Sequence, residues 1–223
     1  EIDPENGDAY FFRGYAYYFL GSNDEALSDF NNALQFGATD TAWVYNVRGL
    51  TYDLLGEYDL ALADFDAAVE LAPNYEAAIQ NRAYVFGVRL GDWKKYTDQY
   101  RILVDLAPDN SDYHNGVGWG LVQQRRYREA LEELNTALDL NPDNSSALDS
   151  RAWAYLGLED YANAEADFRA AIELGEIYSY YGLAELFHAQ GDDEEALVNL
   201  RTYLSEAGAD AAPEALALQE TLR

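Results

Sequence analysis

The sequence predicts an all-α protein assembled from repeated pairs of antiparallel helices, and three observations support that fold class. Two sets of apolar or small residues within 45–73 have the i, i+4, i+7 spacing of one helix face: Tyr45, Gly49 and Tyr52, then Ala61, Phe65 and Ala68. Gly56 lies between the sets, and Pro73 ends the unit because proline cannot continue a helix. This unit then recurs along most of the chain at a nearly constant step.

Two columns of residues show the recurrence. An alanine of the second helix recurs at steps of 35, 35, 34, 34 and 32 residues, with tyrosine once in its place: Ala26, Ala61, Tyr96, Ala130, Ala164 and Ala196. Its partner four residues later keeps that register: Phe30, Phe65, Tyr100, Leu134, Phe168 and Leu200. A helix-turn-helix unit with this period resembles the tetratricopeptide repeat (TPR), over about residues 8–206. The resemblance implies a right-handed superhelix, an α-solenoid with a concave groove.

We expect a single array over residues 1–223, in which every repeat supplies two helices. The repeats are expected at about 8–38, 42–74, 76–109, 111–143, 145–176 and 177–206. Their helices are expected near 8–20 and 24–36, 41–55 and 59–71, 75–90 and 93–106, 111–124 and 128–140, 145–158 and 162–174, and 177–190 and 193–206.

Two segments depart from the regular pattern. Repeat three has one extra residue between Ala83 and Gly91, compared with the same stretch of repeat two. After the sixth repeat, Pro213 falls in the first turn of a further helix, a capping helix expected at about 212–222. Its leucines are expected to cover the open end of the last repeat: Leu216, Leu218 and Leu222.

Several repeats carry an arginine in the first helix and an aspartate in the second. The pairs are Arg13 with Asp29, Arg48 with Asp64, and Arg151 with Asp167. Repeat four lacks both residues and has Val117 and Glu133 instead. Because the two residues are present or absent together, we predict a structural ion pair inside the repeat, bidentate where the geometry allows.

The charge of the chain excludes some classes of partner. There are 41 acidic and 14 basic residues, a net charge of -27, which opposes binding to nucleic acid or to an anionic membrane. A basic or neutral protein partner is favoured instead. Acidity that serves only solubility or salt adaptation is the alternative interpretation.

The sequence indicates a soluble protein whose compartment it leaves undecided. No apolar run approaches the roughly 20 residues that span a bilayer, and no signal peptide opens the chain. The chain has no cysteine, which excludes disulfides and thiolate metal sites. These features leave the localisation unknown.

The sequence shows no pattern of residues for catalysis, a cofactor or a metal. It has only two histidines, and His114 falls where other repeats carry Tyr45, Ile79 or Leu148, so we expect a core or edge position for it. The acidic segments 105–112 and 139–143 lack the central glycine and closing glutamate of a calcium loop, and they fall where helix caps are expected. We therefore predict no enzyme activity, no cofactor and no metal site.

The start of the chain predicts an exposed surface. Residues 1–6 resemble the end of a repeat such as 140–144, which leads us to expect at least one further helix pair before residue 1. The first helix is unusually rich in aromatic residues: Tyr10, Phe11, Phe12, Tyr15, Tyr17, Tyr18 and Phe19. We predict that the chain self-associates through this helix, because a large exposed apolar patch tends to find a partner.

A second stripe on each first helix lies one residue after the buried stripe, about 100 degrees around the helix. In the family that the sequence resembles, this stripe lines the concave groove. We define the groove stripe as Phe11, Tyr15, Tyr18, Trp43, Asn46, Leu50, Asp53, Gln80, Tyr84, Asp112, Asn115, Trp119, Asp149, Trp153, Tyr178, Tyr181 and Glu185. It contains no Lys or Arg, so the cationic clamp that one subclass of the family uses for a terminal carboxylate is not expected.

Aromatic rings interleaved with Asp and Asn favour a segment that carries Arg or Lys and apolar side chains. The alternative is that Tyr84, Trp119 and Trp153 only pack between adjacent first helices. Three functions remain open: a non-catalytic scaffold that binds a protein or peptide in the groove; an assembly or regulatory segment of a larger enzyme or secretion or transport system, acting through its ends or convex face; and, least favoured by the residues, an enzyme.

Overall fold

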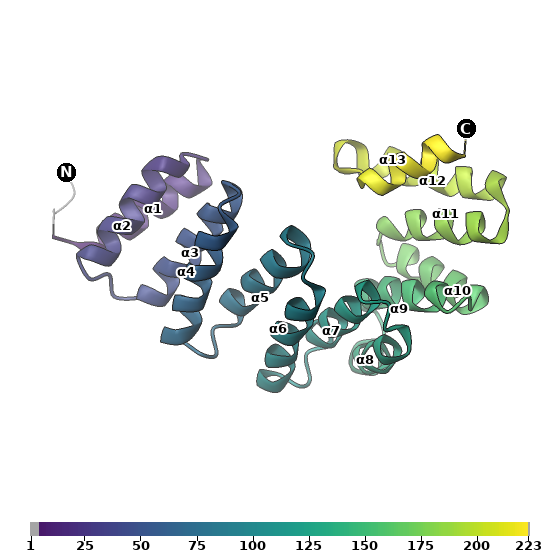
Figure 1. The fold of residues 1–223 in the computed structure, drawn as a ribbon, viewed down its shortest axis with the longest axis horizontal. Coiled ribbons are helices and arrows are strands. Elements are labelled where there is room, and N and C mark those ends of the chain that lie inside the picture. The colour runs from purple at the N-terminus through teal and green to yellow at the C-terminus, as the bar shows by residue number, and fades with distance from the viewer. Residues whose placement is uncertain (1–4, 223) are drawn as a thin grey trace. The chain divides into compact units, whose positions relative to one another are not determined.

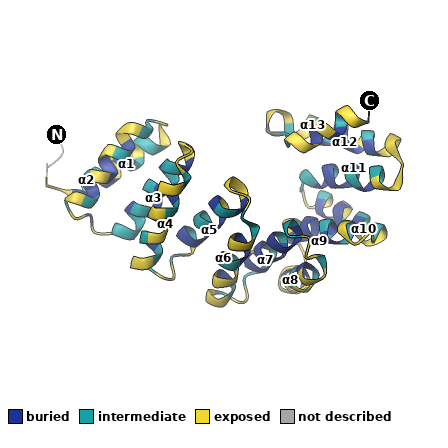
Figure 2. Cartoon of the chain, in the orientation of Figure 1, coloured by how far each residue is buried: buried dark blue, intermediate teal, exposed yellow. Residues whose placement is uncertain are grey.

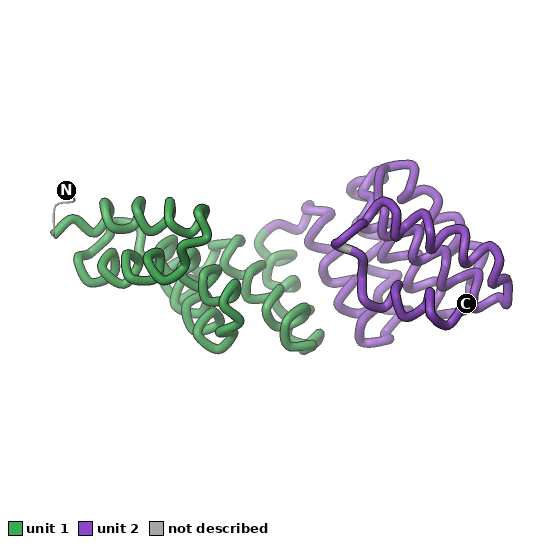
Figure 3. Tube along the Cα trace, turned by 90° about the horizontal axis from the view of Figure 1, so that it is seen from above, with its two compact units in different colours: residues 1–106 green, residues 107–223 purple. Residues whose placement is uncertain are grey.

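The structure is a computed structural model that describes residues 5–222, and all regular structure within that range is helical (Figure 1). The chain divides into two compact units, Glu1–Leu106 and Ala107–Arg223 (Figure 3). Within each unit, successive helices pair as the periodicity predicts, which confirms the all-α class. The single array over 1–223 stays a prediction. The resemblance of residues 1–6 to a repeat end rests largely on positions outside the described residues.

The first unit contains three helix pairs. Its elements are α1 (Gly7–Phe19), α2 (Asn23–Gln35), α3 (Thr41–Leu54), α4 (Tyr58–Leu71), α5 (Glu76–Tyr84), the π-helix η1 (Val85–Arg89) and α6 (Trp93–Leu106). The second unit contains three further pairs and a final helix. Its elements are α7 (Ser111–Gln123), α8 (Tyr127–Leu140), α9 (Ser145–Gly157), α10 (Tyr161–Glu173), α11 (Tyr178–Gln190), α12 (Asp193–Ala207), the short 3-10 helix η2 (Gly208–Asp210) and α13 (Pro213–Thr221).

Small residues allow close packing within each pair, and the buried faces lie between the paired helices (Figure 2). A Cβ added to Gly49 would lie 2.7 Å from the Phe65 ring and 3.2 Å from the backbone oxygen of Ala61. A Cβ added to Gly118 would lie 2.5 Å from Leu134. The glycines are therefore required by the close approach of the second helix.

Asparagine side chains cap two of the first helices of the second unit, α7 and α9. The side-chain oxygen of Asn110 accepts a hydrogen bond of 2.9 Å from the Asp112 backbone N–H at the start of α7. Asn144 accepts one of 3.0 Å from Ala147 at the start of α9. Both asparagines belong to the turns that we expected to cap helices, which confirms the capping interpretation of those turns.

The predicted ion pairs between Arg and Asp are present and bidentate. Arg48 donates to the two carboxylate oxygens of Asp64 over 2.7 and 2.6 Å, and Arg151 donates to Asp167 over 2.7 and 2.9 Å. Arg13 makes the same pair with Asp29. Arg48 and Arg151 each also donate to an asparagine of the preceding second helix, Asn31 and Asn135 respectively. The guanidinium thus joins neighbouring repeats as well as the two helices of its own repeat.

The extra residue of repeat three is accommodated in η1. The backbone N–H of Leu90 bonds to the oxygen of Val85 over 3.1 Å, an i to i-5 hydrogen bond. Gly87 in this segment makes room for the second helix, because a Cβ there would lie 2.6 Å from Tyr96 and 2.9 Å from Trp93. The tyrosine that replaces the usual alanine therefore fits against a glycine of its own repeat.

The final helix packs on α12, but not through all the leucines that we expected. Ala215 and Leu218 are buried, and Leu222 packs against the same cluster, whereas Leu216 is 48% exposed. The prediction for Leu216 was wrong because residues 215, 218 and 222 share one face of a helix that begins at Pro213. The Tyr203 hydroxyl accepts a hydrogen bond of 3.0 Å from the Ala212 backbone, which holds the chain just before this helix.

The aromatic surface of α1 is smaller than the sequence predicts. Phe11 is only 3% exposed, because it packs against Phe30 and Trp43. Exposure is concentrated in Phe12 at 59% and Phe19 at 69%, beside Leu20 at 77%. The remaining tyrosines of this helix are partly buried.

Candidate functional site

The second unit has a hollow of about 290 Å³ beside its first helices. It is lined by residues of α7, of α9 and of the segment that leads into α11: Asn115, Trp119, Ser146, Asp149, Ser150, Glu176 and Tyr178. The hollow therefore brings together Asn115, Trp119, Asp149 and Tyr178 of the groove stripe. Sequence reasoning missed the other three, although Glu176 is the acidic residue two positions before Tyr178.

Asp149 is the buried acidic residue of the hollow. It lies just over one turn into α9 and is 7% exposed. Its Oδ1 accepts a hydrogen bond of 2.5 Å from the Ser179 hydroxyl. Burial raises the pKa of Asp149 to about 7, the Ser179 hydrogen bond opposes that rise, and the negative charge of Glu176 adds to it. Asp149 therefore changes its charge near neutral pH.

The charged groups of the hollow are acidic. Glu176 accepts a hydrogen bond of 3.3 Å from the Tyr178 backbone, and the side-chain oxygen of Asn115 is buried without a hydrogen-bond partner. None of the described residues around the hollow is Lys or Arg. Two acidic groups and the rings of Trp119 and Tyr178 line the same hollow, an environment that attracts a cationic hydrogen-bond donor.

Trp153 and Tyr181 of the groove stripe belong to an aromatic cluster next to the hollow. The Trp153 ring lies 5.7 Å from Tyr181 and 5.5 Å from Phe168, and its indole nitrogen is buried without a hydrogen-bond partner. Tyr181 is 6% exposed, and its hydroxyl donates to Glu185 over 2.6 Å. Trp153 thus has the packing position that we gave as the alternative, whereas Trp119 lines the hollow.

In the first unit, Trp43 lines a hollow of about 400 Å³ together with Asp40, Ala42, Ala72, Asn74 and Tyr75. Phe11 and Tyr15 pack against the Trp43 ring, with centroids 4.5 and 5.5 Å away. Tyr18 stacks on Tyr15 at 6.5 Å. These four aromatic residues form a continuous cluster on α1 and α3.

Two polar residues of the groove stripe are already bonded within the first unit. Asn46 is 5% exposed and accepts a hydrogen bond of 2.9 Å from the Asn81 amide. Asp53 is 9% exposed and accepts from Nε and Nη2 of Arg89, both over 3.0 Å. The Arg89 guanidinium also lies 5.1 Å from the Tyr84 ring.

An arginine from outside the groove stripe thus reaches one of its acids, which the stripe pattern did not predict. Arg89 follows Asp53 by 36 residues, one more than the usual step, because repeat three contains the extra residue. The π-helix takes up that residue, and Arg89 at its end meets Asp53. The signal was present in the sequence as the insertion between Ala83 and Gly91.

The remaining residues of the groove stripe are dispersed. Leu50 packs partly buried beside Phe65, and Gln80 is partly buried on α5. Tyr84 is 43% exposed. Asp112 is exposed and accepts a hydrogen bond of 2.8 Å from the Asn144 amide.

His114 occupies the core or edge position that we expected. It is 8% exposed, and its ring nitrogens lie 2.9 Å from Glu133 and 3.0 Å from the backbone oxygen of Pro108. Glu133 of repeat four thus pairs with this histidine instead of an arginine. Across residues 5–222 no three acidic, His or Cys residues gather as they would around a metal ion. No helix in that range combines the length and apolar character needed to cross a membrane.

Family models described as "Tetratricopeptide repeat" match most of the chain. One matches residues 42–75, a second matches 7–36, and a third matches the overlapping ranges 97–145, 117–177 and 150–215. The third alone spans more than half of the sequence. No curated protein matches the sequence significantly.

Solved structures of the same fold include three that cover most of this chain. A tetratricopeptide repeat protein from Parabacteroides merdae is 17% identical, with a TM-score of 0.83, over 97% of this chain and 85% of that one. PilW, described as a type IV pilus biogenesis factor, is 19% identical, with a TM-score of 0.69, over 83% and 86%. YrrB, described as a TPR protein with an unusual peptide-binding site, is 21% identical, with a TM-score of 0.55, over 86% and 97%. At these identities the likeness concerns the fold.

Proposed function

The chain belongs to the tetratricopeptide repeat family, whose members generally act as non-catalytic scaffolds for protein interaction, and from that premise we propose that it binds a protein segment carrying basic and apolar side chains. The proposed site is the hollow on α7, α9 and α11 of the second unit. The partner is held as an extended or helical segment. One basic side chain of that segment enters the hollow.

The observation that carries this proposal is the chemistry around Asp149. Asp149 and Glu176 supply negative charge without a basic residue among those that line the hollow, and Trp119 and Tyr178 supply aromatic surface. An Arg or Lys side chain satisfies both features, because it pairs with the carboxylates and lies against the rings. The fold of YrrB, whose description names a peptide-binding site, supports a peptide ligand for this architecture.

A direct test uses a fluorescein-labelled peptide of alternating leucine and arginine, with a leucine and glutamine peptide as the probe control. We expect the arginine peptide to bind more tightly in fluorescence anisotropy, and its binding to weaken as salt is added. Trp119→Ala and Asp149→Asn should each weaken it roughly tenfold. Glu132→Gln on α8 and Tyr84→Ala in the first unit are the matched acidic and aromatic controls, and they should bind like the wild type.

The proposal fails if both peptides bind equally or if the two hollow variants bind like the wild type. Thermal unfolding of each variant distinguishes loss of binding from loss of folding. Trp153→Ala is informative as well, because this ring packs against three others and its removal should lower Tm by several degrees.

We propose as a second role that the chain associates through the exposed apolar residues of α1, which agrees with the alternative of an assembly segment in a larger system. Phe12, Phe19 and Leu20 are each more than half exposed. Exposed apolar groups of this kind favour association with a second copy of the chain. The description of PilW as a pilus biogenesis factor supports an assembly role for this fold. Sedimentation equilibrium should show a dimer that Phe12→Ser with Phe19→Ser abolishes, and a strict monomer at high concentration would exclude this role.

A further inference from the structure

The turn between α7 and α8 concentrates positive charge in a strongly acidic chain. Arg125, Arg126 and Arg128 lie within four residues, although the whole sequence contains only 14 basic residues against 41 acidic ones. All three are exposed. A basic corner of this kind stands out from the surrounding acidic surface.

Arg125 has an unfavourable backbone conformation for a residue with a side chain. Its φ is 58°, in the left-handed region that favours glycine. At the corresponding turn, four other repeats have glycine with positive φ, namely Gly21, Gly56, Gly91 and Gly191, and repeat five has Glu159 at φ 61°. Arg125 thus adds a positively charged side chain at a turn position where four other repeats have glycine.

Among the residues that the structure describes, the side chains of two of the three arginines make no ion pair. Arg126 donates to both carboxylate oxygens of Glu129, over 2.8 and 2.5 Å. Within residues 5–222, by contrast, Arg125 and Arg128 make no ion pair. Arginines elsewhere in the chain commonly hold a carboxylate, as Arg48 and Arg151 do. Arg125 and Arg128 are therefore available to an external anion.

The turn also has a fixed shape with an apolar floor. A hollow of about 300 Å³ is lined by Arg125, Arg126, Tyr127, Arg128, Glu129 and Leu158. The Tyr127 ring rests against Gly157 at the end of α9, where a Cβ would overlap the ring. Leu158 beside it is 38% exposed. The packing of Tyr127 against Gly157 positions the backbone of the turn, and the side chains of Arg125 and Arg128 extend from it into solvent.

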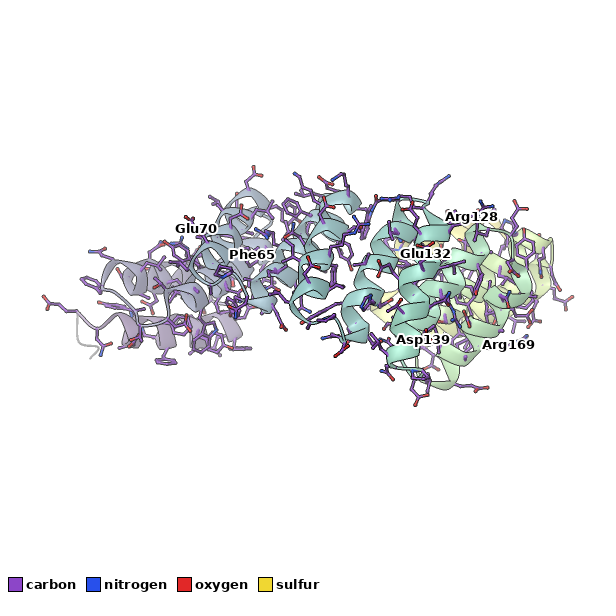
Figure 4. The ribbon with its side chains drawn as sticks, turned by 90° about the horizontal axis from the view of Figure 1, so that it is seen from below. Phe65, Glu70, Arg128, Glu132, Asp139 and Arg169 are labelled. Carbon is purple, nitrogen blue, oxygen red and sulfur yellow. The ribbon has the colours of Figure 1, made fainter. Side chains whose placement is uncertain are left out.

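We propose that the turn between α7 and α8 is a second binding surface, which accepts a short acidic segment of a partner protein. Arg125 and Arg128 donate to one or two carboxylates, and an apolar side chain of the segment contacts Leu158. A short segment fits better than a long polyanion. Glu132 and Asp139 follow Arg128 along α8, so an extended anion laid along that helix would meet carboxylates (Figure 4).

The test uses a fluorescein-labelled peptide of alternating leucine and glutamate, and the same peptide with glutamine in place of glutamate. Anisotropy at low ionic strength should show tighter binding of the glutamate peptide and a loss of affinity as salt is added. The double variant Arg125→Gly with Arg128→Gln should bind this probe roughly tenfold more weakly. Its Tm should not fall, since glycine suits this turn. Arg201→Gln is the matched control and should bind like the wild type.

Equal binding of the two peptides, or unchanged binding by the double variant, would overturn the proposal. Tighter binding of a single-stranded oligonucleotide or of anionic phospholipid vesicles through the same arginines would also overturn it, in favour of a general polyanion site. The Asp149→Asn variant separates this surface from the hollow beside the first helices. It should leave binding of the glutamate peptide unchanged, whatever it does to binding of an arginine peptide.

Discussion

The two units carry the same stripe of residues on their first helices but satisfy its polar groups differently. In the first unit, Asn46 is bonded to another amide and Asp53 is bonded to the guanidinium of Arg89. In the second unit, Asp149 occupies the repeat position of Asn46 and accepts a hydrogen bond from the Ser179 hydroxyl, with no ion pair to an Arg or Lys among the described residues. A paired surface has little need of a ligand, whereas a buried carboxylate without a cation retains its attraction for one.

A single inserted residue accounts for part of this difference. The extra residue in repeat three is taken up as the π-helix Val85–Arg89, and Arg89 at its end reaches Asp53. The second unit has no such insertion among its helices, and no arginine lines the hollow around Asp149 within the described residues. One inserted residue, taken up as a π-helix, thus places an arginine beside an acid of this stripe in the first unit. Without such an insertion, the acid of the second unit has no arginine partner and can attract a basic group of another protein.

Removal of Arg89 should leave Asp53 of the first unit without a cationic partner, as Asp149 is in the second unit. Arg89→Ala leaves Asp53 buried without its cation, and we expect a loss of about 2 to 3 kcal/mol in the free energy of unfolding. The arginine side chain is one-third exposed, which keeps this below the full value for a buried pair. Denaturant titration measures the loss.

Two further variants decide whether the charge is responsible. Asp53→Asn in the Arg89→Ala background should recover most of the lost stability, because the amide needs no counter-ion. Arg101→Ala removes an arginine from an exposed pair with Asp98 at 3.6 Å, and its effect should be within about 0.5 kcal/mol. No recovery in the double variant would mean that Arg89 acts through packing on Tyr84.

Much of the fold was predictable because it repeats. The pairs Arg48 with Asp64 and Arg151 with Asp167 form as expected, since the same register recurs in independent repeats. The helix starts are likewise set by local capping at residues such as Asn144. These features depend on residues close in sequence or at a fixed step.

The site was less predictable, because it depends on contacts between repeats and on turn residues that helical spacing does not describe. Phe11 was placed on the groove surface by spacing alone, yet Trp43 of the next first helix covers it. Arg89 was missed because an i to i-5 turn is invisible to a 3.6-residue period. The hollow around Asp149 also needs Glu176, which lies in a turn outside any helical stripe.

The second test acts on the unpaired acid itself. Asp149 has a pKa raised to about 7 in the folded chain, against an ordinary value of 3.8. The folded state thus binds the proton more tightly than the unfolded state, so this group favours folding at low pH and the advantage is lost as pH rises towards 7. The loss between pH 5 and 7 should be about 2 kcal/mol.

The Asp149→Asn variant separates the pH dependence of stability due to Asp149 from that due to the other acidic residues. Its stability relative to the wild type should rise between pH 5 and 7 and level off above pH 7, in denaturant titrations at each pH. Glu132→Gln, an exposed acid on α8, should show no such trend. A constant difference between Asp149→Asn and the wild type across this range would mean that Asp149 is charged throughout.

The smallest expected effect concerns the turns that join the helices of each pair. The first unit has Gly21, Gly56 and Gly91 in the left-handed conformation, whereas the second unit has Arg125 at φ 58° and Glu159 at φ 61° in addition to Gly191. Arg125→Gly should raise the free energy of unfolding by up to about 1 kcal/mol, and the reciprocal Gly56→Ala, at φ 78°, should lower it by a similar amount. Thermal unfolding of both variants measures the pair of shifts. A fall in stability for Arg125→Gly would show that the arginine supports the fold of its own unit, whereas a rise together with weaker binding of an acidic peptide would separate its ligand contacts from its structural role.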